Sequence, residues 1–211
     1  MKHHAPLRVV VATGNAGKLR ELRACLADLP LSLVAQGELD VASPTEDGLS
    51  FVENALIKAR HAARITGLPA LADDSGIEVP ALGGAPGIYS ARYAGEGASD
   101  EDNIRKLLAE MQSLQGSQRQ ARFRCVIVFM RHAEDPVPLI CEGAWDGHIA
   151  DTPGGKAGFG YDPVFRIAGD SRTAAELAPE EKNRLSHRAV ALRQLRDRLR
   201  SEIPAISFDT G

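Results

Sequence analysis

The feature that most constrains the fold is the N-terminal stretch VVVATGNAGK, residues 9–18. Its three valines are typical of a strand buried on both faces. The glycines Gly14 and Gly17 then allow a sharp turn. An amphipathic helix is predicted over 17–29, because leucines recur at steps of three and four: Leu19, Leu22, Leu26 and Leu29. A buried strand followed directly by such a helix indicates an α/β fold.

Strands and helices continue to alternate along the chain. Ser50 and Glu53 form a capping-box pattern that begins a long helix, and Gly67 ends it. Two apolar stretches joined by the turn AEDP predict an antiparallel hairpin that joins the sheet. The expected elements are strands at 7–12, 31–36, 121–132 and 138–150, a strand in LPALADDSG (68–76) that runs into a tight turn, a glycine-rich loop at 79–100, and helices at 17–29, 50–67, 100–111 and 179–203. The last helix is expected to begin near Pro179 and to turn four residues inward: Leu185, Ala189, Leu192 and Leu199.

Length and composition limit the class of protein. A chain of 211 residues can form one large domain, or one domain with a second lobe. Its net charge of −3 argues against non-specific binding of nucleic acid. The three cysteines lack C-x-x-C spacing, which argues against a zinc site or a disulfide framework and favours a reducing compartment. Without an apolar leader or a stretch of membrane-spanning length, a cytoplasmic protein is expected, with no membrane partner.

The glycine turn is suited to an anion, since backbone N–H groups and the positive end of a helix meet there. It is not a Walker A loop: only two residues separate its glycines, and Leu19 follows Lys18. The dinucleotide fingerprint fits better, with Ala12 in place of the first glycine and acidic Glu38 and Asp40 about twenty positions on. A phosphate loop, a dinucleotide loop and an ordinary strand-to-helix turn all remain open at this point.

A second group of polar residues fits poorly in an apolar context. Asn54 and Lys58 stand one helical turn apart within FVENALIKA. Asp73 and Asp74 adjoin at the expected end of an apolar strand, where α/β sheets place ligands. Mg²⁺ together with Lys58 would offset the repulsion between these carboxylates, and Glu46 would supply a further oxygen ligand. A solvated helix face and a simple Asp-Ser-Gly turn are the alternatives.

Two further clusters carry hydrogen-bond donors and an aromatic ring. GGKAGFGYDPVF contains Phe159, Tyr161 and Asp162, which would stack on a ring and accept a hydrogen bond from its edge. EKNRLSHR is expected to put Lys182 and Ser186 on one helical face, with His187 and Arg188 just beyond. A surface loop and ordinary helix-surface charge are the alternatives for these two stretches.

Six stretches taken in order resemble the inosine triphosphate pyrophosphatase family, over roughly residues 8–198: TGNAGK, FVENALIKA, ADDSG, GIYSARYAG, GFGYDPVF and KNRLSHR. The resemblance, closest to the bacterial branch, implies an enzyme that hydrolyses deaminated purine nucleoside triphosphates (ITP, dITP, XTP and dXTP) to the monophosphate and pyrophosphate. Such an enzyme cleanses the nucleotide pool and so keeps these bases out of DNA and RNA. It implies a Mg²⁺-dependent homodimer. It also implies an elongated α/β fold, a mixed sheet flanked by helices, in which residues 1–211 form one domain of two lobes around a central active-site cleft.

The resemblance also implies roles for individual residues. The triphosphate would bind to Thr13, Gly14, Asn15, Ala16, Gly17 and Lys18. Asp74 would be the proton acceptor and, with Glu46, a metal ligand; Lys58 and Asp73 would assist in catalysis. Ser75 would touch the substrate, and the base with its neighbouring phosphate would be held by Phe159, Gly160, Tyr161, Asp162, Lys182, His187 and Arg188.

These residue types suit that chemistry. Water must attack in line while the departing diphosphate gains charge, so a carboxylate base and lysines Lys18 and Lys58 are useful. Arg188 only donates, so it would match the O6 acceptor of hypoxanthine or xanthine and reject the adenine amine. Two other hypotheses are an NAD-dependent oxidoreductase and a nucleotide sensor without activity. Neither accounts for both ADDSG and SHR.

Overall fold

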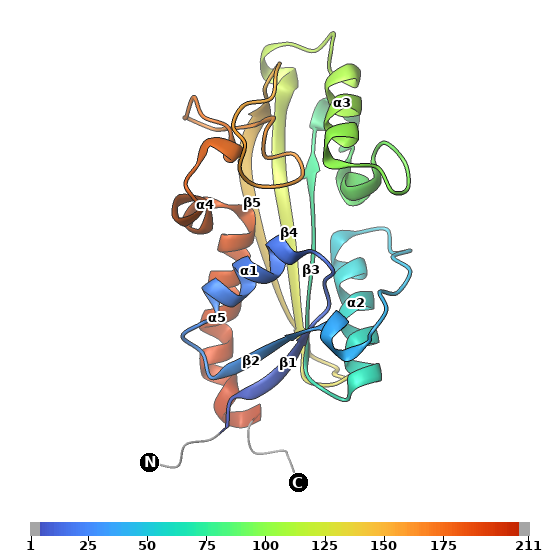
Figure 1. Ribbon diagram of the computed structural model, residues 1–211, viewed down its shortest axis with the longest axis vertical. Coiled ribbons are helices and arrows are strands. Elements are labelled where there is room, and N and C mark those ends of the chain that lie inside the picture. Colours follow the sequence, from blue (N-terminus) through green and yellow to red (C-terminus); the bar gives the residue numbers. More distant parts are fainter. Residues whose placement is uncertain (1–4, 207–211) are drawn as a thin grey trace. The chain divides into compact units, whose positions relative to one another are not determined.

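The computed structural model describes residues 5–206 as strands and helices in alternation (Figure 1). Each strand of the first part is followed by a helix or short turn, as the leucine and valine patterns predict. The bounds are β1 Leu7–Val11, α1 Ala16–Cys25, β2 Leu31–Ala35, α2 Phe51–Thr66, β3 Ala70–Glu78, α3 Asp100–Glu110, β4 Gln120–Met130, β5 Leu139–Ile149, β6 Phe165–Ile167, α4 Pro179–Leu185 and α5 His187–Ile206.

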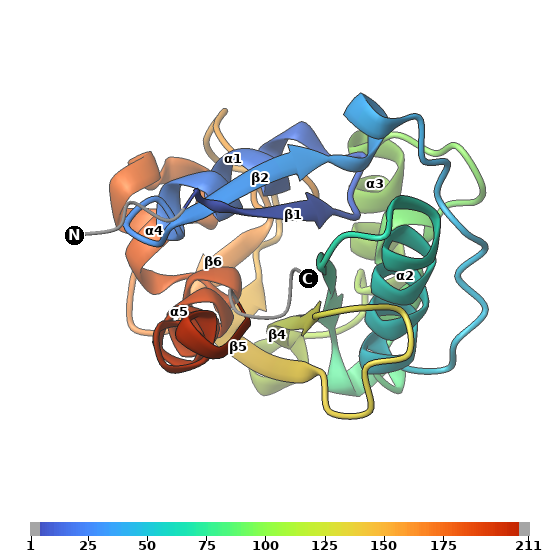
Figure 2. The ribbon, with the colours of Figure 1, turned by 90° about the horizontal axis from the view of Figure 1, so that it is seen from below.

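The six strands form a sheet in the order β2-β1-β3-β4-β5-β6. β1 pairs in parallel with β2, beside it in Figure 2, and with β3. β6 pairs antiparallel with β5, with Ile149 opposite Phe165. The sheet is therefore mixed, and the prediction of an α/β fold with a mixed sheet flanked by helices is confirmed.

The chain divides into two compact units, and each has its own apolar core. In the described range, the first unit comprises residues 5–74, 126–142 and 189–206, and the second comprises 75–125 and 143–188. The first core packs small residues of α2, such as Ala55 and Ala59, with β1 and β4. The second core surrounds the apolar face of α3 with aromatic residues, including Phe123, Trp145 and Phe165.

No helix in residues 5–206 is long and apolar enough to cross a membrane.

Local signals predicted α2 and α3 well. Ser50 caps α2 by accepting a hydrogen bond from the Glu53 amide at 3.3 Å, and Gly67 ends it with a left-handed φ of 67°. The helix predicted over 100–111 is α3, whose Ile104 and Leu107 are buried, as is Met111 directly after its last residue. Asp73 and Asp74 lie within β3, which continues to Glu78, so the predicted tight turn at ADDSG is wrong. Lysines from other elements neutralise both carboxylates, and the backbone stays extended.

Two predicted helices have different ends. α1 stops at Cys25 rather than residue 29: Leu26 leaves helical dihedrals with ψ 10°, and Pro30 disfavours helical dihedrals at Leu29, the predicted last residue. The expected helix over 179–203 is two helices, since Ser186 takes an extended conformation with ψ 159°. Serine is favoured at the residue that precedes a helix, here α5. As a result Leu185 is 39% exposed rather than inward, and the expected single helical face shared by Lys182 and Ser186 does not exist.

The residues between β3 and α3, expected as a glycine-rich loop, contain two short 3-10 turns at Pro80–Leu82 and Gly87–Arg92. The three cysteines, all within the described range, form no disulfide.

Candidate functional site

The turn after β1 is organised by Asn15, which caps α1. Its side-chain oxygen accepts hydrogen bonds from the Gly17 and Lys18 amides at 2.8 and 3.0 Å, and its own amide donates to Thr13 Oγ1 at 3.1 Å. Gly14, Asn15 and Ala16 are exposed. The predicted triphosphate loop is thus an open, preformed turn at a helix N-terminus, where an anion is stabilised by the helix dipole.

The two adjacent carboxylates belong to opposite faces of β3, because successive side chains of a strand alternate. Asp73 pairs with Lys18 of α1, with 2.8 Å between Nζ and Oδ1. Asp74 pairs with Lys58 of α2, also at 2.8 Å. Each carboxylate therefore pairs with its own lysine, and these ion pairs offset the repulsion expected between two adjacent carboxylates.

Lys58 joins Asp74 to the loop that precedes α2. Its Nζ lies 3.1 Å from Glu46 Oε2 as well as 2.8 Å from Asp74 Oδ1. One turn earlier on α2, buried Asn54 accepts a hydrogen bond from the Gly48 amide at 2.9 Å. A Cβ on Gly48 would lie 2.7 Å from that Asn54 oxygen, so this close approach requires glycine. Sequence reasoning paired Asn54 with Lys58 on one face but missed that Asn54 fixes the Glu46 loop.

Burial and charge set the ionisation of this pair. Burial lowers the pKa of Lys58, but the surrounding charges of Asp74, Asp73 and Glu46 outweigh it and leave that pKa above its ordinary value. Burial also raises the pKa of Asp74, and Lys58 only partly offsets this. Lys58 therefore stays charged, while Asp74 is a stronger base than an ordinary carboxylate and is suited to accept a proton from water.

The oxygen atoms of this cluster fit a hard divalent cation. Asp74 Oδ2 is buried and has no hydrogen-bond partner among residues 5–206. Glu46, 30% exposed, supplies a second carboxylate on the same lysine. Within that range no group of three or more His, Cys, Asp or Glu side chains is arranged to hold a metal. Mg²⁺ commonly uses only one or two carboxylates and takes its other ligands from water and substrate phosphates, so these residues fit it.

The second unit gathers the aromatic and basic residues that the sequence singled out. Asp162, 2% exposed, accepts hydrogen bonds from Lys182 Nζ at 2.5 Å and from the Phe159 amide at 2.9 Å. Lys182 Nζ lies 4.7 Å from the centroid of the Phe159 ring, and the Arg188 guanidinium carbon lies 5.5 Å from it. The result is an aromatic ring accompanied by two cations and a carboxylate.

Other predicted base-binding residues are held by their neighbours. The His187 ring stacks on Phe123, with centroids 4.7 Å apart and planes 12° from parallel. Arg188, 2% exposed, lies 3.4 Å from Ser75 Oγ. Tyr161 belongs to the core, and its hydroxyl donates to the Ser90 carbonyl at 2.9 Å, so its ring serves packing.

Gly160, the remaining predicted base-binding residue, donates its amide hydrogen to Asp100 at 2.6 Å. Sequence reasoning did not select Asp100, because nothing local marks a carboxylate that bonds a backbone amide sixty positions away. Glu38, which a dinucleotide loop would use to bind ribose, pairs instead with Arg23 at 3.1 Å. That pairing does not support the oxidoreductase hypothesis.

Comparison with known proteins identifies similar chains over most of this length. The model of the Ham1 family matches residues 9–198. The dITP/XTP pyrophosphatase of Shigella flexneri is 59% identical over 194 residues, covering 92% of this chain and 98% of that protein. The dITP/XTP pyrophosphatase of Yersinia pseudotuberculosis serotype I is 60% identical over 193 residues, with the same coverage. The solved structure of a HAM1 protein from Coxiella burnetii is 51% identical, with a TM-score of 0.87 over 92% of this chain and 99% of that one.

Proposed function

Since the chain belongs to the Ham1 family, we propose that it is a hydrolase that cleaves deaminated purine nucleoside triphosphates into the monophosphate and pyrophosphate. Two findings support this activity together: relatives about 59% identical are dITP/XTP pyrophosphatases, and Lys58 is buried between Asp74 and Glu46. The substrates are ITP, dITP, XTP and dXTP, and their removal keeps these bases out of DNA and RNA. The single observation that carries the chemistry is the Lys58–Asp74 pair.

In this proposal the first cluster handles the phosphates. Thr13, Gly14, Asn15, Ala16, Gly17 and Lys18 bind the triphosphate at the N-terminus of α1. Asp74 accepts the proton of the attacking water, a role supported by its raised pKa. Lys58 and Lys18 stabilise the charge that develops on the departing pyrophosphate, and Asp73 holds Lys18 in place.

The enzyme is proposed to require Mg²⁺. Asp74 and Glu46 would hold the ion, and the rest of its coordination shell would come from water and substrate oxygens. The ion would neutralise phosphate charge and lower the pKa of a bound water. The buried Asp74 oxygen without a hydrogen-bond partner in the described part of the chain supports this assignment.

The second cluster is proposed to hold the base. Phe159 stacks on the purine, and Lys182, His187 and Arg188 surround it with donors, with Asp162 fixing Lys182. Ser75 and the Gly160–Tyr161 backbone complete the contacts, because the Tyr161 ring itself is buried. Asp74 and Ser75 are consecutive residues of β3.

Selectivity follows from the donors. Arg188 has no acceptor, so the N6 amine of adenine would meet a donor where hypoxanthine and xanthine present O6. An unmatched buried donor costs about 1 to 3 kcal/mol, which corresponds to roughly tenfold to a hundredfold discrimination.

The protein is further proposed to be a cytoplasmic homodimer of one domain with two lobes. Sedimentation at the mass of the 22.6 kDa monomer would reject the proposed dimer.

One assay tests the activity. The purified protein is incubated with ITP and Mg²⁺, and monophosphate, pyrophosphate and orthophosphate are measured separately. Equimolar IMP and pyrophosphate are expected. Orthophosphate as the first product indicates a phosphatase, intact ITP that stays bound indicates a sensor, and a response to dinucleotide alone indicates an oxidoreductase. Each of these outcomes rejects the proposal.

A further inference from the structure

Phe159 lies in a part of the chain with little conformational restraint of its own. It stands between Gly158 and Gly160, whose φ values are 84° and 59°. Glycines in the left-handed region tolerate many conformations, so they do not themselves fix the ring between them. Contacts from elsewhere must determine where the Phe159 ring points.

Two carboxylates hold consecutive amides at this point. The Phe159 amide donates to Asp162 Oδ2 at 2.9 Å, and the Gly160 amide donates to Asp100 Oδ2 at 2.6 Å. Asp162 belongs to the same loop, and a Cβ on Gly158 would collide with its carboxylate. Asp100 is different, because it is the first residue of α3, a separate element of the same unit.

A hollow lies beside the Asp100 bond. Residues of α3, including Asp100 and Glu101, and the loop around Phe159 line a pocket of about 650 Å³. Side chains therefore do not fill the space between this loop and the start of α3. A hydrogen bond to a carboxylate is shorter and stronger than one between neutral groups, so the Asp100 bond is a strong contact between this loop and α3.

We propose that Asp100 is a positioning residue for base recognition: by holding the Gly160 amide, it fixes the Phe159 ring for stacking on the purine. This inference rests on the proposed function. A ring that is fixed in advance loses less conformational entropy when the base binds, so the bond improves affinity for the base-bearing part of the substrate. The phosphate-handling residues are unaffected.

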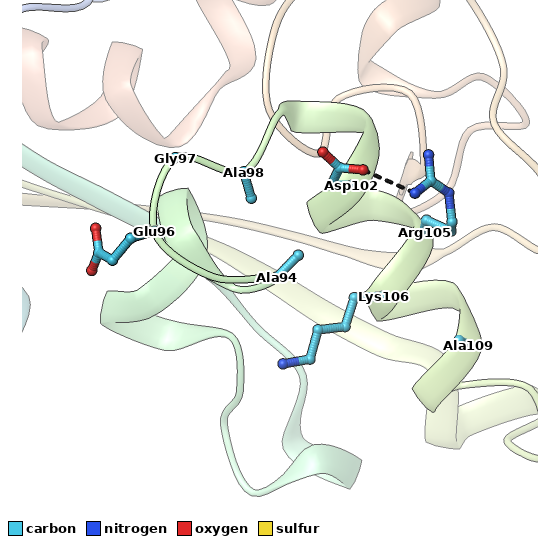
Figure 3. Close-up of a pocket in the computed structure, with 8 residues that line it drawn as sticks. All are labelled: Ala94, Glu96, Gly97, Ala98, Asp102, Arg105, Lys106 and Ala109. Carbon is cyan, nitrogen blue, oxygen red and sulfur yellow. Dashed lines mark hydrogen bonds and ion pairs between the residues drawn. The ribbon is translucent and has the colours of Figure 1, made fainter.

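Neighbouring acidic residues provide matched controls. Glu101 has the same charge, the same first turn of α3 and the same pocket, but its side chain has no hydrogen bond among the residues described. Asp102 bonds to Ser99 and to Arg105, and the second bond is dashed in Figure 3. That close-up draws the residues that line a separate pocket, among them Ala94, Ala98 and Lys106. The volume of this pocket is about 550 Å³. Glu101→Ala therefore removes the same helix-end charge without removing a hydrogen bond to the Phe159 loop.

The experiment compares Asp100→Ala, Asp100→Asn and Glu101→Ala with the unaltered protein. For Asp100→Ala, the KM for ITP is expected to rise about fivefold to twentyfold with kcat within about twofold, the size expected for a lost charged hydrogen bond. Asp100→Asn keeps an acceptor oxygen and should restore most of the loss. Inhibition by IMP should weaken in parallel in Asp100→Ala, whereas inhibition by pyrophosphate, which has no base, should not change. A purely structural role would not separate these two inhibitors.

The outcomes are distinct. If the unaltered protein releases no pyrophosphate from ITP, the proposed function is wrong and the role of Asp100 is rejected with it. If that protein is active but Asp100→Ala behaves like Glu101→Ala, only the positioning role is overturned. Equal weakening of IMP and pyrophosphate inhibition also overturns it, because the effect would then not be confined to the base.

Discussion

At the scale of single residues, the adjacent carboxylates Asp73 and Asp74 have different surroundings. Asp74 has the raised pKa and shares Lys58 with Glu46, whereas Asp73 pairs with Lys18. Asp74→Asn is expected to lower kcat by at least about a hundredfold, since an amide cannot accept the proton of water. An ITP analogue that resists cleavage between its α and β phosphates should still bind.

Asp73→Asn is the matched comparison, because it makes the same chemical change one residue away. It should raise KM more than it lowers kcat, since it releases Lys18 rather than the proton acceptor. Steady-state kinetics and calorimetric Kd values measure both effects. A near-normal kcat in Asp74→Asn would show that Asp74 is not the proton acceptor.

Arg188 carries the prediction on base selectivity. The unaltered protein should prefer ITP to ATP in kcat/KM by roughly tenfold to a hundredfold or more. Arg188→Gln introduces an acceptor as well as donors, so the ITP to ATP ratio should fall by about tenfold. The ratio is measured within one preparation, so a partly inactive variant does not bias it. Arg122→Gln changes an arginine that pairs with Asp146 at the surface and should leave the ratio unaltered.

At the scale of elements, the connection between β4 and β5 depends on Asp135. Its carboxylate accepts from the Arg131 side chain, from the Arg131 amide at 2.9 Å and from the Val137 amide at 3.0 Å. The Arg131 side-chain bond is the main reason that the pKa of Asp135 lies well below its ordinary value. Asp135→Asn should lower the free energy of unfolding at pH 7 by about 1 to 3 kcal/mol.

The pH dependence of that loss has a defined sign. The folded pKa of Asp135 is below the unfolded one, so its stabilisation is complete above about pH 4 and declines as the pH falls toward the folded value. Urea denaturation of both proteins between pH 7 and 3 should therefore show the difference narrowing with acid. Asp146→Asn breaks an exposed ion pair with Arg122 and should cost less than about 1 kcal/mol at any pH. A pH-independent loss in Asp135→Asn would refute the assignment.

Elements with local signals were predictable from the sequence. The Ser50 cap and Gly67 mark both ends of α2, and the alternation of strands and helices predicts the α/β fold. The turn at ADDSG was wrong because contacts with distant residues outweighed local preference, and the unbroken C-terminal helix was wrong because Ser186 takes an extended conformation between α4 and α5. Asp73 and Asp74 lie within a strand, where Lys18 and Lys58, far away in sequence, pair with them. The family resemblance was nevertheless confirmed, since the model of the Ham1 family matches residues 9–198.

The candidate site was predictable to a similar degree. The Lys58 and Asp74 pair was suggested by unusual polar residues in apolar stretches, and the structure brings the two together. The residues that hold the site were not predictable. Asn54 bonds the Gly48 amide and Asp100 bonds the Gly160 amide, and any sequence can supply a backbone N–H. Such contacts depend on the folded path of the chain rather than on residue types.

At the scale of the whole molecule, a protein with a net charge of −3 must bind an anionic substrate. Local lysines and the helix N-terminus provide positive potential at the first cluster, but their own carboxylates largely neutralise them. Additional positive charge is therefore needed when the triphosphate binds. A divalent cation that binds together with the nucleotide would provide it.

Metal removal tests this arrangement. Because the described residues offer no group of three or more metal-ligating side chains, Mg²⁺ alone should bind weakly and leave the Tm nearly unchanged. Mg²⁺ with IMP and pyrophosphate together should raise the Tm, since ligands that bind only the folded state stabilise it by mass action. Excess EDTA should reduce pyrophosphate release from ITP by at least about a hundredfold, and added Mg²⁺ should restore it. Full turnover in EDTA would show that Lys18 and Lys58 suffice without a metal. A large Tm rise with Mg²⁺ alone would instead indicate a resident metal site that Asp74 and Glu46 do not account for.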